Sequence, residues 1–468
     1  MHQEVTTSCQ AVAIARPSRA KTVVNVKSAA ALWPSAVMSE VATTTEINRN
    51  GNPQSPSDLT RNQDEERSGA TIANATCMYD NGGETDMIVQ LQAAVLLGFW
   101  HSKNDDHTQP WYWTGIAINL CYIMGLHRDP DTGNFNPSVT DRRRSLWRRL
   151  WWSCFFRDRW LSLTLGRPLR ISLNSCNTPL PSLTDLVCDL YDMPRAIANA
   201  YIPDDFTQLA EYWIVLMRLT KLLGDTLTLC YQPFGPSPTL QQVEALEAEF
   251  FRLGLPERCA EGQSRLATFS LYHLQLHYQA SVITFYRPCM AKAPEGLPSS
   301  QLQAWQAEIR NKIDAAALQT NAILDNLVRE KLLDFAEPMT PPLLVPAMHI
   351  HLLNCKAGDD LLRRLSLNKL DFCMLVMQEM QETYTCASVY RGIFLEAIRQ
   401  LFPSYSVDAA ETDVEAPGAP ASPQRQDKSF MGTLLNDSFI DELMHESSLF
   451  NIWEYLPMME GHWAEENA

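Results

Sequence analysis

The sequence predicts an all-α protein with a polar segment at each end, and three observations carry that prediction. From residue 85 to about residue 403, apolar side chains recur at helical spacing in one stretch after another, with prolines between the stretches. No run of β-branched and aromatic residues alternates with a period of two, so a substantial sheet is not expected. With 46% hydrophobic residues among 468, the chain can bury one large core or two modest ones.

Ten helices are predicted in chain order. The first, over 86–103, carries Leu91, Val95 and Phe99 at helical spacing. The second, over 111–126, ends near a glycine that is followed by a proline, which is a common helix stop. The third is long and rich in tryptophan, over 141–165. Seven more helices are expected at 206–230, 239–253, 264–286, 301–333, 342–354, 367–383 and 385–402.

The composition divides the chain into four parts. Residues 1–84 are rich in Ser, Thr, Asn and Ala and lack periodicity, which predicts a disordered N-terminal segment. A helical domain follows over 85–403, then a Pro/Ala linker over 404–428 and an acidic, hydrophobic tail over 429–468. No secretory signal is evident, and no apolar stretch reaches eighteen residues. We therefore expect an intracellular protein without a membrane span.

The tail has the composition of an activation domain. It contains eight carboxylates and no Lys or Arg, so the acids repel one another and keep the segment solvated. Short amphipathic helices are expected to form on a coactivator surface and to present five apolar side chains: Phe439, Leu443, Phe450, Trp453 and Leu456. The alternative is that the tail packs onto the helical domain as a terminal helix.

The charge is unevenly distributed along the chain. The net charge is −16, and thirteen acids against two bases after residue 403 account for −11 of it, which leaves −5 for the rest. The acidity therefore does not exclude an anionic partner for the helical domain. Twelve scattered cysteines include no C-x-x-C pair, so we expect free thiols in a reducing compartment.

Residues for catalysis or metal binding are not apparent in the pattern. There is no phosphate-cradling glycine loop and no G-x-S-x-G motif. His273 and His277 could share a helix face, but no third ligand follows, and His349 and His351 point to different sides of a helix. The acid pairs at 105–106 and 359–360 are expected to be solvated loop acids. We predict no catalytic residues, no cofactor and no bound metal, although a helical enzyme stays a remote alternative.

The stretch 141–170 contains nine arginines and, after Asp141, one acid, Asp158. A nucleic-acid helix is one interpretation. On a helical wheel, however, an apolar stripe favours a core element; it consists of Trp147, Trp151, Cys154, Phe155, Asp158, Leu161 and Leu165. The arginines away from that stripe, Arg143, Arg149 and Arg157, are then structural. Asp158 needs an ion pair, for which Arg167 and Arg170 are candidates.

Three motifs together resemble a known family. WYWTGIAINLCYIMGLHRDP at 111–130 is followed by RRRSLWRRLWWSCFFRDRWLSLTLGRPLRIS at 142–172 and by Thr178-Pro-Leu-Pro. In this order and spacing they resemble the middle homology region of fungal binuclear zinc-cluster transcription factors, most closely regulators of the cutinase transcription factor beta type. The resemblance implies an all-α regulatory domain, a nuclear location and control of transcription. It also marks a core motif: Trp147, Trp151, Asp158, Arg159, Gly166, Arg167 and Pro168.

One departure from that family concerns its zinc cluster. The family's cluster uses six cysteines, whereas residues 1–85 contain only Cys9 and Cys77. We therefore expect this chain to bind no zinc. Either it reaches DNA through a missing domain, or it is a DNA-blind cofactor or dominant-negative partner of zinc-cluster factors. The genomic sequence upstream of Met1 distinguishes the two, because the first requires an in-frame exon that encodes six cysteines.

The expected partners and targets follow from the resemblance and from the tail. They are transcriptional coactivators, a second copy of the chain or another zinc-cluster factor as a dimer partner, and DNA through a missing domain or a partner. The family's habits suggest a secondary-metabolite gene cluster as the target.

Overall fold

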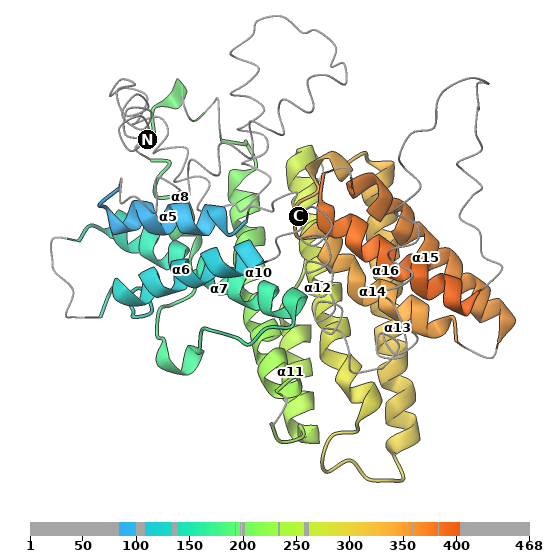
Figure 1. Ribbon diagram of the computed structural model, residues 1–468. Helices are drawn as coiled ribbons and strands as arrows, with labels where there is room; N and C mark the ends of the chain where they lie inside the picture. The colour runs from blue at the N-terminus through green and yellow to red at the C-terminus, as the bar shows by residue number, and fades with distance from the viewer. Residues whose placement is uncertain are drawn as a thin grey trace, which may run out of the picture. The chain divides into compact units, whose positions relative to one another are not determined.

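The computed structural model describes residues 84–402, apart from gaps at 100–107, 133–138, 192, 197, 199–201, 233–234, 257–261, 357–358 and 382. The N-terminal segment (except Glu84), the linker and the acidic tail lie outside the described residues. Figure 1 shows one helix after another along the described chain, and the predicted all-α class is confirmed there. Among the described residues, strand-like pairing is confined to a single bridge between Thr239 and Glu295.

The chain falls into two compact units, which divide within one long helix. The first unit holds α5 (Met87–Leu97), α6 (Thr108–Ile123), the part of α7 (Asp141–Leu165) up to Arg157, and the segment 171–203. That segment contains the 3₁₀ turn η1 (Leu173–Ser175) and the short helix α8 (Leu183–Val187). The second unit holds the rest of α7 and all the helices that follow residue 204.

The core of the first unit is formed around α7. Trp151 and Phe155 have no exposed surface, and the ring of Tyr122 on α6 meets Trp151 edge to face, with centroids 5.7 Å apart. The thiols of Cys121 and Cys154 lie 3.6 Å apart between the same two helices. α7 has the bounds that its periodicity predicts, because a continuous apolar stripe without proline or glycine runs its full length.

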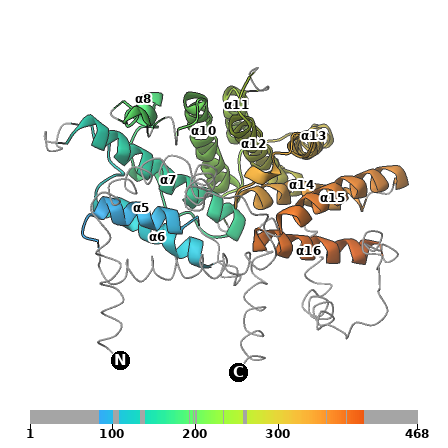
Figure 2. The ribbon, with the colours of Figure 1, turned by 90° about the horizontal axis from the view of Figure 1, so that it is seen from above.

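The second unit contains seven more α-helices. They are α10 (Phe206–Cys230), α11 (Leu240–Arg252), α12 (Arg265–Ala291), α13 (Leu302–Arg329), α14 (Thr340–Asn354), α15 (Asp360–Met380) and α16 (Thr385–Leu401), with the 3₁₀ turn η2 (Leu333–Phe335) before α14. α12 is the central helix, since it packs against α10, α13 and α14. α15 and α16 form a neighbouring pair that packs on α14 (Figure 2).

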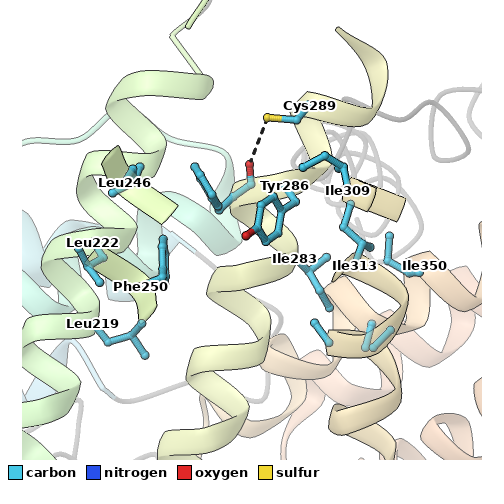
Figure 3. Close-up of a cluster of buried hydrophobic side chains, with 14 of the residues drawn as sticks. Leu219, Leu222, Leu246, Phe250, Ile283, Tyr286, Cys289, Ile309, Ile313 and Ile350 are labelled. Atoms are coloured by element: carbon cyan, nitrogen blue, oxygen red, sulfur yellow. Dashed lines mark hydrogen bonds between the residues drawn. The ribbon is translucent and has the colours of Figure 1, made fainter. Parts of the chain in front are cut away.

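Side chains from five helices meet in the core of the second unit, which Figure 3 shows in close-up. Leu219 and Leu222 of α10 face Leu246 and Phe250 of α11, with Ile283 of α12 beside them. Ile309 and Ile313 of α13 and Ile350 of α14 close the cluster from the other side. These residues recur at intervals of three or four along their helices, so the helical period places them together.

α6 is shifted by three residues from its predicted bounds, and α13 ends four residues before its predicted end. Two larger differences, in α12 and α15, have identifiable reasons. α12 continues to Ala291, past Pro288, although the pattern predicts its end at 286. Proline cannot donate to the carbonyl four residues earlier. Here the Tyr231 hydroxyl donates to that carbonyl, Thr284 O, at 2.7 Å, so the helix continues.

α15 begins at Asp360, seven residues before the predicted start. The Asp359 carboxylate caps it by accepting from Leu361 N at 3.0 Å. Asp359 and Asp360 are solvated as predicted, but their assignment to a loop was wrong, since one is an N-cap and the other lies in the first turn. The pattern hid this start because the leucines of the first turns are exposed and form no buried stripe.

Candidate functional site

The arginines in the first half of α7 bind aspartates from elsewhere in the first unit. The guanidinium of Arg148 donates to Asp185 at 2.7 Å and to Asp131 at 2.8 Å. Asp185 also accepts from the Ser145 hydroxyl at 2.7 Å. Burial acts to raise the pKa of Asp185, but hydrogen bonds from Arg148 and the two serines lower it below its ordinary value. This carboxylate is therefore ionised and held at neutral pH.

A second aspartate, Asp189, forms salt bridges with two more arginines of α7. Asp189 accepts from Arg142 at 2.5 Å and from Arg149 at 2.5 Å, and the Arg149 side chain has no exposed surface. Arg144 bonds Asp131 and Asp141. Four arginines of the basic run are thus neutralised inside the unit. A nucleic-acid helix needs its cations free at the surface, so the structural role is the one that the geometry supports.

The loop after α7 is fixed in place by the motif residues. The Thr178 hydroxyl donates to Leu126 O at 2.7 Å, and the Trp152 indole donates to Pro179 O at 2.7 Å. These bonds join the T-P-L-P segment to the end of the first motif and to α7. The next residues form α8, whose capping box pairs the N-cap Ser182 with Asp185 at N3, so Asp185 both completes the cap and accepts from Arg148.

Asp158 lies in the second unit, and its predicted burial and ion pairing are confirmed. Its side chain has no exposed surface and forms a salt bridge with Arg159. The main-chain N–H of Arg170 donates to both carboxylate oxygens, at 3.1 and 3.3 Å. The pattern did not predict the salt bridge with the adjacent Arg159. Of the two predicted candidates, Arg170 donates its main-chain N–H, and its guanidinium also interacts electrostatically with Asp158.

The glycine that ends α7 explains how Arg170 reaches this carboxylate. Gly166 adopts a positive φ of 60°, and the N–H of Arg167 donates to Ser162 O at 3.1 Å, as in a Schellman helix end. Gly166, Arg167 and Pro168 are exposed at this turn. The G-R-P motif thus reverses the chain and brings the Arg170 N–H back onto Asp158.

A second glycine makes room for the Arg159 guanidinium. Gly224 lies on α10, and a Cβ atom there would come within 2.6 Å of Arg159 Nε. One turn earlier, Thr220 accepts from the Trp160 indole at 3.2 Å. α10 therefore holds this end of α7 through a hydrogen bond and one close backbone approach.

The helical wheel was wrong for some residues of α7. Arg149 and Arg157 were placed away from the apolar stripe, yet both are buried. Arg157 donates to Gly98 O, and its guanidinium lies 4.1 Å from the centre of the Phe99 ring. Trp147 lies on the predicted stripe but is only half-buried, near the start of the helix. α7 is enclosed on nearly every side in its middle, so a one-sided stripe underestimates its burial.

The buried histidines of the second unit form structural contacts. Nδ1 of His277 donates to His273 O at 2.8 Å, and its ring meets Trp160 edge to face, 4.5 Å between centroids. Burial lowers the pKa of His277 to about 4 and also lowers that of His273, so both rings are neutral at pH 7. His349 faces Arg287 while His351 bonds Asn321, on different sides of α14 as predicted.

A groove of about 900 Å³ opens on the second unit, where α12 and α13 meet the end of α11. Its walls carry carboxamides such as Gln275, Gln279 and Asn326, with Tyr272 and Phe250 beside them. Among the described lining residues Glu330 is the charged one, and it accepts from the Tyr272 hydroxyl at 2.8 Å. The described walls therefore suit an uncharged, hydrogen-bonding molecule.

Neither a metal-binding cluster nor a membrane-spanning helix occurs in the described part of the chain. No group of three or more His, Cys, Asp and Glu side chains there is arranged to hold a metal ion. No helix described between residues 84 and 402 combines the length and apolarity needed to cross a membrane. The tail residues Phe439, Leu443, Phe450, Trp453 and Leu456 lie outside the described residues.

The profile of the fungal specific transcription factor domain matches residues 41–279. The chain therefore belongs to the fungal specific transcription factor domain family. The match includes α7 and its ionic partners and begins within the N-terminal segment, before the first described helix. No solved structure matches the chain.

Among curated proteins, the chain is 28% identical over 368 residues to cutinase transcription factor 1 beta of Fusarium vanettenii, which covers 69% of this chain and 40% of that protein. It is 26% identical over 351 residues to a transcription factor of Fusarium pseudograminearum, covering 66% of this chain and 38% of that protein. An uncharacterized transcriptional regulatory protein of Schizosaccharomyces pombe is 27% identical over 217 residues, or 44% of this chain and 26% of that protein. The chain thus spans about 40% or less of each of these relatives.

Proposed function

We propose that the chain is a fungal transcriptional regulator that acts through its helical domain and its acidic tail. The observation that supports this most strongly is the family match over the region where α7 binds its aspartates. The relatives that match over most of the chain are transcription factors. The helical domain is proposed to carry regulation, and the activity is proposed to be regulatory rather than enzymatic.

The tail is proposed to supply activation. Its eight carboxylates and absent cations keep Phe439, Phe450 and Trp453 accessible to a partner surface. Coactivators are the proposed partners, and binding is proposed to order short amphipathic helices. The proposed location is the nucleus, where such partners are found.

The proposal is tested by fusing the full chain to a heterologous DNA-binding domain and measuring a reporter gene. The fusion is expected to activate the reporter, and deletion of residues 429–468 is expected to abolish activation. Deletion of residues 1–40, which has the same length, is the control and should leave activation unchanged. A silent full-length fusion, or equal effects of the two deletions, would contradict the proposal.

A second candidate is a DNA-blind cofactor or dominant-negative partner that forms dimers with zinc-cluster factors. Within residues 1–85, Cys9 and Cys77 are too few to hold a binuclear zinc cluster, so this stretch itself is proposed to bind none. Under this candidate the purified chain contains no stoichiometric zinc and retards no promoter fragment by itself. Elemental analysis that gives about two zinc ions per chain, or sequence-dependent retardation in high salt, would exclude it.

A further inference from the structure

The first turns of α15 carry three leucines that face solvent. Leu361 is 65% exposed, Leu362 42% and Leu365 46%. These three residues are called the leucine ridge here. Further along the same helix the apolar side chains of Leu370, Cys373 and Met377 are fully buried. The ridge is therefore the part of α15 where three neighbouring leucines are exposed together, whereas Leu375, also exposed, lies ten residues beyond Leu365.

The ridge is held helical by polar contacts and not by burial. The Asp359 carboxylate caps the helix, and Asp360 pairs with Arg363 at 3.2 Å and with Arg364 at 3.1 Å. Both guanidiniums stay partly exposed beside the leucines, at 44% and 75%, and they share the Asp360 carboxylate between them. A preformed helical turn with leucines and flanking arginines is a surface suited to an acidic, apolar peptide.

The described chain ends beside this surface. α16 packs along α15, and the two helices lie side by side in Figures 1 and 2. At the end of α16, the Phe402 ring lies 5.4 Å from the Arg363 guanidinium carbon. Residue 403 therefore continues from the edge of the leucine ridge.

The segment that continues from this point has the complementary chemistry. Residues 429–468 carry eight carboxylates, no Lys or Arg, and the apolar set Phe450, Trp453 and Leu456. The 26 residues 403–428 connect it to Phe402. A random coil of 26 residues has a root-mean-square span of roughly 30 Å and gives an effective concentration on the order of millimolar. A weak contact is thus sufficient for docking within one chain.

We propose that the leucine ridge of α15 is the docking site of the chain's own acidic tail, with Phe450, Trp453 and Leu456 covering the leucines and the tail carboxylates meeting Arg363 and Arg364. A second copy of the chain is a poorer occupant, because stable dimers bury on the order of 1,000 Å² or more and three leucines at one helix end provide far less. The regulatory consequence rests on the proposed function: a docked tail is withheld from coactivators.

The test is hydrogen exchange of the full chain, followed by mass spectrometry. In the wild-type chain, amides of residues 446–458 are expected to exchange about tenfold more slowly than in the Leu361→Glu/Leu365→Glu variant, because glutamates repel the acidic tail. Leu375→Glu is the matched control, since Leu375 is also an exposed leucine of α15, at 61%, and lies ten residues from Leu365. It should leave tail exchange as in the wild type. Equal tail exchange in all three proteins would overturn the proposal.

Two further measurements keep the result interpretable. Exchange in α12 should be the same in every variant, which verifies the fold. The second measurement uses the full chain with Phe450→Ala/Trp453→Ala, which leaves α15 unchanged. In this variant, amides of residues 360–368 should exchange faster than in the wild type. The increase should be about as large as the increase in tail exchange that the ridge variant causes. If exchange at residues 360–368 does not increase, the ridge is not the docking site. Sedimentation that shows a dimer lost only in the ridge variant would also overturn the proposal, in favour of a second copy.

The reporter fusion separates this proposal from the proposed function. The ridge variant in the full-chain fusion is expected to activate several-fold more than the wild type, while the Leu375→Glu fusion matches the wild type. A tail that activates but shows no protection by the ridge would contradict docking and leave the proposed function standing. A tail that is protected in the wild type but activates in neither the wild-type nor the ridge-variant fusion would contradict the proposed function and leave docking standing.

Discussion

Asp158 is a buried carboxylate whose charge is balanced by the Arg159 guanidinium and by the main-chain N–H of Arg170. Removal of one member of such a buried pair leaves the other without compensation. We predict that Asp158→Ala lowers the free energy of unfolding by about 3 kcal/mol or more. The measurement is chemical denaturation beside Asp141→Ala, whose carboxylate is 92% exposed. Equal stabilities of the two variants would show that Asp158 carries no such role.

Gly224 lies against the Arg159 side chain and gives a second prediction about the stability that the Asp158–Arg159 pair contributes. Glycine to alanine within a helix ordinarily stabilises a protein by about 0.5–1 kcal/mol. Here the new Cβ would lie 2.6 Å from Arg159 Nε, so the guanidinium must leave Asp158. Gly224→Ala is therefore expected to lower the unfolding temperature, whereas Lys221→Ala on the exposed face of α10 should leave it nearly unchanged. A rise in the unfolding temperature of Gly224→Ala would mean that the close approach does not matter.

His277 predicts a pH dependence of stability. Its folded pKa of about 4 lies below the ordinary 6.5, so the unfolded chain binds the proton more tightly. The stability from the neutral ring is present above pH 6.5 and is lost as pH falls toward 4. Between pH 7 and pH 5 this one group should lower the free energy of unfolding by about 2 kcal/mol. In His277→Asn, the free energy of unfolding should change less between pH 7 and pH 5 than in the wild type. The same pH dependence in both proteins would show that His277 is not its source.

At the scale of elements, α11 begins with a reciprocal cap. The Thr239 hydroxyl accepts from Gln242 N at 3.3 Å, and the Gln242 side chain accepts from Thr239 N at 2.9 Å. Thr239→Ala should cost about 1 kcal/mol in the free energy of unfolding, because an N-terminal amide loses its acceptor. Thr239→Ser keeps the hydroxyl and serves as the control. If the alanine and serine variants denature alike, the cap does not contribute.

Helix positions were largely predictable where the apolar stripe is continuous. α7 and α10 have the predicted bounds because their stripes run unbroken from end to end. The end of α12 was not predictable, since it depends on the Tyr231 hydroxyl reaching the carbonyl that Pro288 leaves without a donor. The start of α15 was missed because its leucines face solvent and give no buried period.

The candidate site was less predictable than the helices. The pattern showed that α7 is a core element, but the partners of Arg148 and Arg149 lie about forty residues away in sequence. A helical wheel contains no information about such distant partners, so it placed Arg149 and Arg157 outside the core. The Arg159 pair was missed because adjacent residues on a helix normally point apart.

At the scale of the whole molecule, the chain contains two chemically different parts. In the helical domain, arginines of α7 pair with aspartates of the same domain. The tail carries acids and no Lys or Arg. The domain defines the family, and the tail carries the proposed activity. The leucine ridge of α15 supplies a proposed physical link between them. The stability of the domain, the docking of the tail and activation by the tail are tested by separate measurements, so a failed prediction about one leaves the other two untouched.

The central claim, that residues 429–468 activate transcription through their apolar side chains, is tested most directly by fusing this segment alone to a heterologous DNA-binding domain. The wild-type segment should activate a reporter. Replacing Phe439, Leu443, Phe450 and Trp453 by Ala should abolish that activity, because the partner groove loses its apolar anchors. Removing two or three carboxylates should only weaken it. A silent wild-type fusion, or full activity in the alanine variant, would contradict the account.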